Sequence, residues 1–224
     1  DYIYRYIIKK MENKPQSQQN IKEIESSYYP GKLIVIMNEF FNNQKNIEKC
    51  SQNISYWEAY VKQFFNKKCK FCIIMNQEGK QWIFNSGNET LPLIFKEKYS
   101  ENVSLIDVNM NEPYEYILNS EKSEEDGNQY MLQIKKFSKV EKYQESLVIT
   151  NGILTVLFDQ NLKINNFEFQ SLSHKEYRKD ENYDLPLNDF GITPQFSRTL
   201  VISEALTEMI DSINRRSEER FSRN

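Results

Sequence analysis

The sequence is poor in the residues that mark several common classes of protein. Its 224 residues include only six glycines and six prolines, which excludes collagen-like and low-complexity chains. One histidine and three cysteines offer little for a metal centre or a disulfide framework. No apolar run reaches the ~18 residues that a membrane-spanning helix needs. Acidic residues outnumber basic ones by 32 to 29, and this net charge of −3 excludes a basic coat that wraps nucleic acid.

The chain does contain enough apolar material for a sizeable core. Hydrophobic residues make up 39% of it and aromatic residues 13%, which is too much for a disordered protein. The length fits a single domain. We expect a partly flexible N-terminal extension over residues 1–29, the folded domain over residues 30–214, and a basic C-terminal tail over residues 215–224. The small, odd number of cysteines favours a reducing compartment.

Helical spacing of apolar residues appears in four segments, which are residues 32–49, 55–65, 90–99 and 196–214. In the second segment, Ser55 and Glu58 are expected to form a capping box. The third starts at Thr90, and the proline two residues later suits a first helical turn. The last segment has an apolar stripe opposite a polar face, which is typical of a helix that packs one side on a core. This stripe consists of Ile202, Ala205, Leu206, Met209, Ile210 and Ile213.

Alternating and β-branched runs predict strands over residues 69–75, 81–85, 102–110, 130–137, 147–150, 153–158 and 162–172. We expect hairpin turns near Gly79 and at Asn151-Gly152, because Asn-Gly between two β-branched runs is a strong hairpin signal. A further turn is expected at 159–161, and residues 119–128 form an acidic segment that we interpret as a solvated loop. The order of these elements indicates an α+β domain in which a curved antiparallel sheet wraps around helices.

Groups that could carry chemistry are few. Cys69 and Cys72 have the spacing of zinc ligands, but the remaining histidine and cysteine make a poor four-ligand set, so we expect two buried or half-buried thiols. His174 lies at a strand end with Glu176 two residues further on. We expect it to have a surface or hydrogen-bonding role rather than to act as a catalytic base. The sequence therefore predicts no catalytic, cofactor-binding or metal-binding residue.

Most aromatic residues fit a core before they fit a binding site. The expected core aromatics are Trp57, Phe64, Phe65, Trp82, Phe158, Phe167 and Phe169. Nucleic-acid stacking would need aromatic rings interleaved with basic residues. Lys67, Lys68 and Lys70 beside Phe71 form the one such cluster in the sequence. Direct nucleic-acid binding is therefore a minor alternative.

Six segments, in order and with compatible spacing, resemble motifs of the LIM-domain-binding family of transcriptional adaptors, to which the SEUSS-like plant proteins belong. They are residues 37–42, 56–65, 90–95, 153–169, 174–178 and 191–209, and the match extends roughly over residues 30–214. One of them is the aromatic helix Tyr56-Trp-Glu-Ala-Tyr, which ends in a Phe-Phe pair, and it is the six segments together that are specific. The chain is identified as a divergent member of this family, matching its dimerisation domain.

The resemblance implies a cone-shaped fold similar to nuclear transport factor two, in a nuclear, non-enzymatic adaptor without a cofactor. It implies self-association as a homodimer or with a related protomer. It also implies binding of a single-stranded-DNA-binding-protein-like or LEUNIG-like co-regulator, so that any association with DNA is indirect. LIM binding is not carried over, because the family's LIM-gripping segment is not among the matched motifs.

We expect the dimer interface to be apolar and to combine the short helix with the turn before the last helix. The residues concerned are Leu91, Leu93, Ile94, Phe95, Ile192 and Phe196. The alternative is that both segments belong to the core. On the interface hypothesis, Leu91→Arg should give a folded monomer. The runner-up function is a small-molecule-binding or enzymatic protein that uses the mouth of the same cone.

Overall fold

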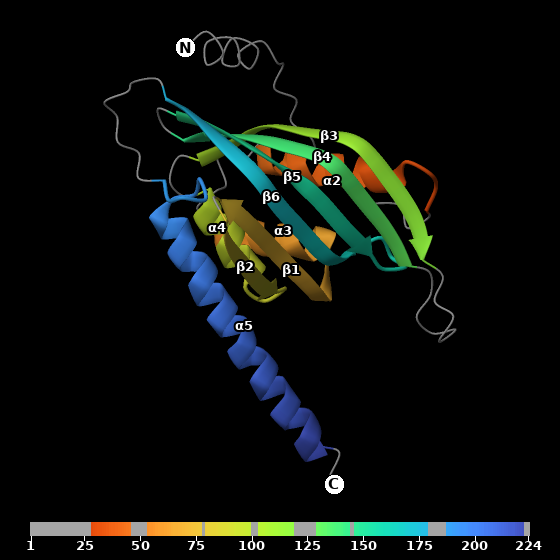
Figure 1. The fold of residues 1–224 in the computed structure, drawn as a ribbon. Helices are drawn as coiled ribbons and strands as arrows, with labels where there is room; N and C mark the ends of the chain where they lie inside the picture. Colours follow the sequence, from red (N-terminus) through yellow and green to blue (C-terminus); the bar gives the residue numbers. More distant parts are fainter. Residues whose placement is uncertain are drawn as a thin grey trace.

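A computed structural model describes residues 28–45, 53–77, 79–99, 103–118, 129–143, 146–178 and 187–221 (Figure 1). Nearly all of the expected N-terminal extension and the acidic segment 119–128 lie outside the described residues, so the interpretations of both stay predictions. In the last helix, side chains are described through residue 216.

Six strands of the described residues form one curved, open sheet (Figure 1). They are β1 (Phe65–Gln77), β2 (Lys80–Gly87), β3 (Val103–Leu118), β4 (Gln129–Tyr143), β5 (Ser146–Phe158) and β6 (Ile164–Arg178). Their order across the sheet is β2-β1-β6-β5-β4-β3. Four neighbouring pairs are antiparallel, whereas β1 runs parallel to β6. The sheet is mixed because the β1–β2 hairpin joins the meander through that one parallel pairing.

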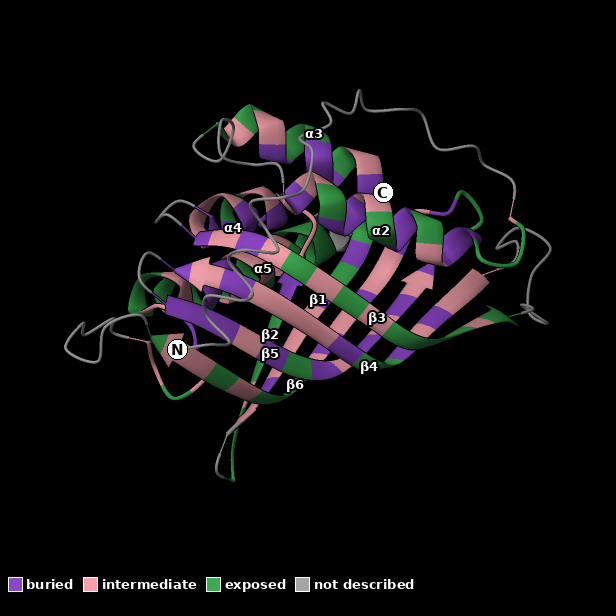
Figure 2. Ribbon diagram, turned by 90° about the horizontal axis from the view of Figure 1, so that it is seen from above, coloured by how far each residue is buried: buried purple, intermediate pink, exposed green. Residues whose placement is uncertain are grey.

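The described residues contain four helices, which are α2 (Lys32–Lys45), α3 (Ile54–Phe64), α4 (Leu91–Lys98) and α5 (Pro194–Phe221). Helices α2, α3 and α4 lie on the inner face of the curved sheet (Figure 2). Helix α5 extends well away from the body of the domain (Figure 1). The predicted α+β fold, a curved sheet wrapped around helices, is confirmed, but the sheet is mixed rather than antiparallel throughout. Helix α5 continues past residue 214, where we expected the domain to end.

Two helices begin at caps that helical spacing did not identify. The side chain of Asn53 accepts a hydrogen bond from the N–H of Ser55, 3.0 Å away, and thereby caps α3. The Ser55 cap was wrong because asparagine is at least as good a cap and stands at the actual start of the helix. For α2 the cap comes from β3, where the Glu115 carboxylate accepts the N–H groups of Gly31 at 2.9 Å and Ile34 at 3.2 Å. A carboxylate is favoured there by the helix dipole.

Aromatic rings fill the space between the sheet and its three inner helices. Trp57 of α3 stacks on Phe95 of α4 with 5.6 Å between ring centroids, and Phe40 of α2 meets Phe95 edge-on. Six of the seven expected core aromatics are buried, namely Trp57, Phe64, Phe65, Phe158, Phe167 and Phe169. Trp82 is half-buried instead and packs against Phe190. The interior of the cone is therefore a packed aromatic core.

Strand β5 passes without interruption through residues 151–152, so the predicted Asn-Gly hairpin is wrong. Strands β4 and β5 turn instead between Tyr143 and Ser146, which pair with each other. Gly152 lies at an irregularity in the β5–β6 pairing. A Cβ atom there would lie 2.7 Å from the Phe169 ring and still closer to the β6 backbone. Glycine is thus needed for the close approach of two strands rather than for a turn.

Candidate interaction surface

Helix α5 contacts the body of the domain through the fully buried Leu200 and, further along, through polar side chains. Glu204 Oε1 accepts a hydrogen bond from the backbone N–H of Asn85, 3.0 Å away. Thr207 Oγ1 accepts one from the N–H of Gly87, 3.2 Å away. Both donors belong to β2, the strand at one edge of the sheet. The polar side of α5 therefore covers an open edge and satisfies backbone donors that an edge strand would otherwise expose.

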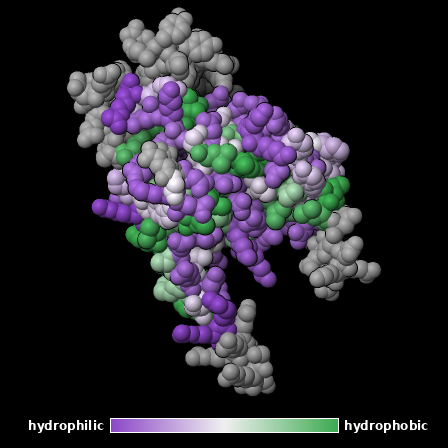
Figure 3. All heavy atoms as spheres, viewed as in Figure 1, coloured by the Kyte–Doolittle hydropathy of each residue, from purple (hydrophilic) through white to green (hydrophobic). Residues whose placement is uncertain are grey.

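The apolar side of α5 faces away from the body. Val201, Ile202, Met209 and Ile213 are 52, 59, 53 and 55% exposed, and Ala205 between them is also exposed. We call these five residues the α5 stripe. Figure 3 shows hydrophobic residues along the projecting helix on the face in view. The helix is amphipathic as predicted, but four residues of the predicted apolar face, Ile202, Ala205, Met209 and Ile213, are exposed rather than packed on the core. The other two, Leu206 and Ile210, are half-buried. Such a patch on a projecting element is typical of a protein-interaction site.

The structure brings the six predicted interface residues together, mostly inside the chain's own core. Leu91, Ile94, Phe95 and Ile192 are buried members of one hydrophobic cluster, and Phe196 is half-buried against it. Leu93 is 46% exposed. Among these six, Leu93 has the side chain that a second chain can reach most directly. The placement of the dimer interface stays a prediction. The α5 stripe was not chosen because its spacing was assigned to packing.

A second exposed apolar cluster lies at the end of β3, the opposite edge of the sheet. This β3 cluster consists of Tyr114, Tyr116 and Leu118 on one face of the strand and Ile117 on the other. Lys135 of the neighbouring strand β4 lies over the Tyr114 ring, with its ammonium 4.7 Å from the ring centroid. Glu115, between the two tyrosines, is engaged with α2, which fixes this part of the strand. The domain therefore exposes apolar side chains near both edges of its sheet, on α5 beside β2 and on β3 itself.

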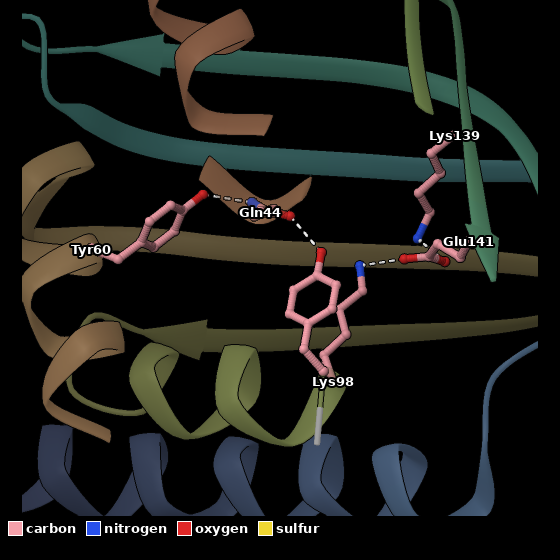
Figure 4. Close-up of polar contacts among 6 residues, drawn as sticks. Gln44, Tyr60, Lys98, Lys139 and Glu141 are labelled. Atoms are coloured by element: carbon pink, nitrogen blue, oxygen red, sulfur yellow. Dashed lines mark hydrogen bonds and ion pairs between the residues drawn. The ribbon is translucent and has the colours of Figure 1, made fainter. Parts of the chain in front are cut away.

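A buried ionic group lies beside the aromatic core (Figure 4). The carboxylate of Glu141 on β4 contacts the ammonium of Lys98 at 2.7 Å through one oxygen and that of Lys139 at 2.8 Å through the other. Burial alone would raise the pKa of Glu141, but the two lysines outweigh it and lower the pKa to about 2. Burial lowers the pKa of Lys139 to about 8. For Lys98, attraction to Glu141 overcomes burial and raises the pKa.

A separate hydrogen-bonded chain begins at Tyr99, next to Lys98, and runs into the core. The Tyr99 hydroxyl donates to Gln44 Oε1 at 2.6 Å, and Gln44 Nε2 donates to the Tyr60 hydroxyl at 2.6 Å (Figure 4). Tyr60 in turn donates to the carbonyl of Phe40 at 3.0 Å. Because the partners satisfy one another, the arrangement ties α2, α3, α4 and β4 together. Both oxygens of Glu141 are occupied by lysines, so this carboxylate is poorly placed to act as a general base.

The two strand cysteines are as predicted, since Cys69 is buried and Cys72 half-buried. Burial raises the pKa of Cys69 to about 12, which makes its thiol unreactive. His174 is half-buried beneath Gly191, where an added Cβ would lie 2.6 Å from the imidazole. Within the described ranges, no three His, Cys, Asp or Glu side chains gather closely enough to hold a metal ion.

The basic cluster considered for nucleic acid does not form a stacking platform. Phe71 is buried and stacks on Phe167 with ring centroids 5.0 Å apart. Lys67, Lys68 and Lys70 are exposed beside it without an accessible aromatic partner in that motif. A base therefore has no ring to stack on here. In the part of the chain that the structure describes, no helix is long and apolar enough to cross a lipid bilayer.

The fold and surface define a cone-shaped α+β domain with an aromatic interior and an exposed apolar helix. The family model for LIM-domain binding proteins matches residues 35–179, and the chain belongs to that family. It is 24% identical over 184 residues to the transcriptional corepressor SEUSS of Arabidopsis thaliana, across 71% of this chain and 20% of that protein. The chain thus spans about a fifth of the length of this curated relative.

Solved structures with a related shape are far more distant in sequence. One is an association domain of the calcium/calmodulin-dependent kinase II type from Exiguobacterium sibiricum, 10% identical with a TM-score of 0.39. The match covers 66% of this chain and 98% of that structure's chain. Another is an LEH-like epoxide hydrolase from M. tuberculosis, 9% identical with a TM-score of 0.36. The match covers 76% of this chain and 90% of that structure's chain. At these values neither structure carries a conclusion about activity.

Proposed function

We propose that this chain is a non-enzymatic, self-associating adaptor module of a nuclear transcriptional co-regulator complex. The observation that carries the proposal is the α5 stripe, a row of half-exposed apolar side chains on a helix that projects from the domain. Membership of the LIM-domain binding protein family and the likeness to a transcriptional corepressor support the co-regulator context.

Covering the stripe of one copy releases a free energy comparable to the minimum cost of association. Fully burying a large apolar side chain is worth roughly 1.5–3 kcal/mol, so covering a half-exposed one is worth about 1 kcal/mol. Val201, Ile202, Met209 and Ile213 together therefore supply about 4 kcal/mol. Association itself costs at least about 4 kcal/mol in lost freedom of motion. The stripe can thus start an interface, and contacts along its flanks must complete one.

The expected partners are a second copy or a related protomer on one side and a co-regulator on the other. By resemblance, the co-regulator is of the single-stranded-DNA-binding-protein-like or LEUNIG-like kind, and DNA is reached only through it. Two separate exposed apolar areas, the α5 stripe and the β3 cluster, support a module with more than one contact surface.

The runner-up function, catalysis or small-molecule binding in the cone, finds less support. The aromatic rings of Phe40, Trp57 and Phe95 occupy the region between sheet and helices. The one fully buried carboxylate among the described residues, Glu141, is held between two lysines. A binder in this fold would need a roomy, polar-lined pocket, whereas these groups are engaged with one another.

Light scattering over a concentration series tests self-association. We expect the mass of the purified chain to rise from one chain to two with concentration, and Met209→Glu to keep the mass of one chain. Tyr116→Asp is the matched control, because it places a charge on the β3 cluster instead and should leave the dimer intact. A mass of one chain at every concentration would contradict the proposal.

A further inference from the structure

We propose that two copies of this chain pair α5 against α5 in antiparallel orientation, about a twofold axis that passes between Leu206 and Met209. This inference rests on the proposed self-association and names its partner and geometry. It arises from three features of α5, which are the spacing of its outward residues, the symmetry of that spacing, and the position of one arginine.

The first feature is a coiled-coil seam. Ile202, Leu206, Met209 and Ile213 follow one another at intervals of four, three and four residues, which is the alternation of a and d positions in a heptad repeat. Ile202, Met209 and Ile213 are more than half exposed, and Leu206 is half-buried at the side of the row. The body contacts α5 on the other side, through Leu200, Ser203, Glu204 and Thr207. A second helix can therefore reach the seam.

The second feature is the symmetry of this seam. In an antiparallel pair, two residues face each other when their numbers add to the same total. Positions 202 and 213 add to 415, and positions 206 and 209 do as well. Each a residue then meets a d residue of the other copy, with Ile202 against Ile213 and Leu206 against Met209. The seam is therefore self-complementary, as an isologous twofold contact requires.

The ends of the helix obey the same symmetry. Helix α5 runs from Pro194 to Phe221, and these numbers also add to 415, so the axis of the seam falls at the middle of the helix. Two copies would overlap over all 28 residues without an overhang. A shifted register would leave the helix ends without a facing partner and would therefore bury fewer residues. The length of α5 thus matches the arrangement that its seam selects.

The third feature decides the orientation. Arg216 occupies the next seam position after Ile213 and is exposed. In a parallel, in-register pair it would face Arg216 of the other copy, and two like charges would meet on the seam. In the antiparallel pair it faces Thr199 of the other copy, which is uncharged. Ala205 and Ser212, which flank the seam, are small and uncharged, so two helices can approach closely there.

Cysteine pairing tests the orientation. We would prepare Ile202→Cys and Ile213→Cys as separate variants, oxidise each alone and as a mixture with oxidised glutathione, and measure the cross-linked dimer on a non-reducing gel. In the antiparallel pair, each new cysteine lies next to the other variant's cysteine but ~16 Å along the helix from its own counterpart. A disulfide requires Cα atoms within about 7 Å. We expect the mixture to cross-link and neither variant alone to exceed the wild-type background.

The outcomes separate this inference from the function on which it rests. Cross-linking of each variant with itself would show a parallel pair and overturn the inference. The inference also fails if the wild-type chain is a dimer by light scattering but the mixture does not cross-link. In that case the chain still self-associates, but through a surface other than α5. If the wild-type chain stays monomeric at every concentration, the proposed function itself fails. As a second readout, Ile213→Glu should weaken the dimer at least about 30-fold, whereas Tyr116→Asp should not.

Discussion

Glu204 of α5 accepts a hydrogen bond from the backbone N–H of Asn85 on β2, across 3.0 Å. Two residues along the same strand, the N–H of Gly87 is bonded to Thr207 in the same way. A helix side chain thus takes the place of a neighbouring strand at the sheet edge. This arrangement protects the edge from pairing with another chain, and it turns the apolar side of α5 outward.

Removing these acceptors should loosen α5. Glu204→Ala and Thr207→Val each leave an edge N–H without its partner, and we expect each change to lower the free energy of unfolding by about 1 kcal/mol. Urea unfolding followed by circular dichroism measures the loss. Glu208→Ala on the exposed side of the helix is the control and should change stability little. Equal effects of Glu204→Ala and Glu208→Ala would contradict the proposed role of Glu204.

Leu91 and Leu93 lie two residues apart on α4, but the same substitution should destabilise the domain strongly at Leu91 and hardly at all at Leu93. Leu91 is fully buried, so Leu91→Arg places an unpaired charge in the aromatic core and should cost more than about 4 kcal/mol. The variant should unfold rather than give the folded monomer first expected for it. Leu93→Arg should stay within about 0.5 kcal/mol of wild type, because Leu93 is exposed. Thermal unfolding distinguishes the two, and a folded Leu91→Arg would refute the placement of α4.

Gly152→Ala should be far more damaging than Gly87→Ala. At Gly152 the new methyl group would collide with the Phe169 ring and with the β6 backbone, neither of which can move freely. We expect a loss of about 2–4 kcal/mol in the free energy of unfolding. At Gly87 the nearest atoms are side-chain atoms, Glu89 Oε2 at 3.1 Å and the Thr207 methyl group at 3.3 Å, and a shift of a few tenths of an ångström accommodates the new methyl group. If urea denaturation gave the two variants similar stabilities, the close approach of β5 and β6 would be wrong.

The free energy of unfolding should fall at acidic pH because Glu141 becomes protonated. Its pKa is about 2 in the folded chain against 4.5 without the fold, so the unfolded chain takes up the proton first as the pH falls. The resulting stability, about 3 kcal/mol, is complete above pH 4.5 and is lost progressively towards pH 2. Glu141→Gln should remove that slope and lower stability at pH 7 by about 3–5 kcal/mol. An unchanged acid slope in Glu141→Gln would show that other carboxylates cause it.

The two lysines that contact Glu141 should not be equivalent. The folded environment raises the pKa of Lys98 but lowers that of Lys139 to about 8, so the charge of Lys98 is favoured and that of Lys139 is not. We therefore expect Lys98→Met to cost about 1–2 kcal/mol more than Lys139→Met at pH 7. Stability of the wild-type chain should also rise between pH 8 and 10.5, where the unfolded chain holds the Lys139 proton more tightly. Lys139→Met should lack this rise.

Much of the fold could be predicted because its signals are local. The spacing of Trp57, Tyr60, Val61 and Phe64 predicts both the existence of α3 and the side that it buries. Gly79 marks the β1–β2 hairpin, and Pro92 lies in the first turn of α4 as expected. These elements could be predicted because backbone preferences and the one buried side of a helix are both visible in a short stretch of sequence.

Other features depended on contacts between distant segments. Gly152 looked like a turn residue because Asn-Gly favours turns, but its role is set by the approach of β6. The carboxylate that caps α2 comes from Glu115, 84 residues away from Gly31. The predicted interface residue Leu91 is fully buried, because α3 and α5 pack on α4 from other parts of the chain. No local pattern records these partners.

The sequence by itself determined that the chain forms an α+β domain, where most helices and strands lie, and that α5 has one apolar and one polar side. Only the tertiary structure decided that β1 pairs in parallel with β6 and that the polar side of α5 faces the body. The physical reason is that periodicity records which side of a helix is apolar but not what lies opposite it. At α5, the unpaired N–H groups of β2 required acceptors, and Glu204 and Thr207 supplied them.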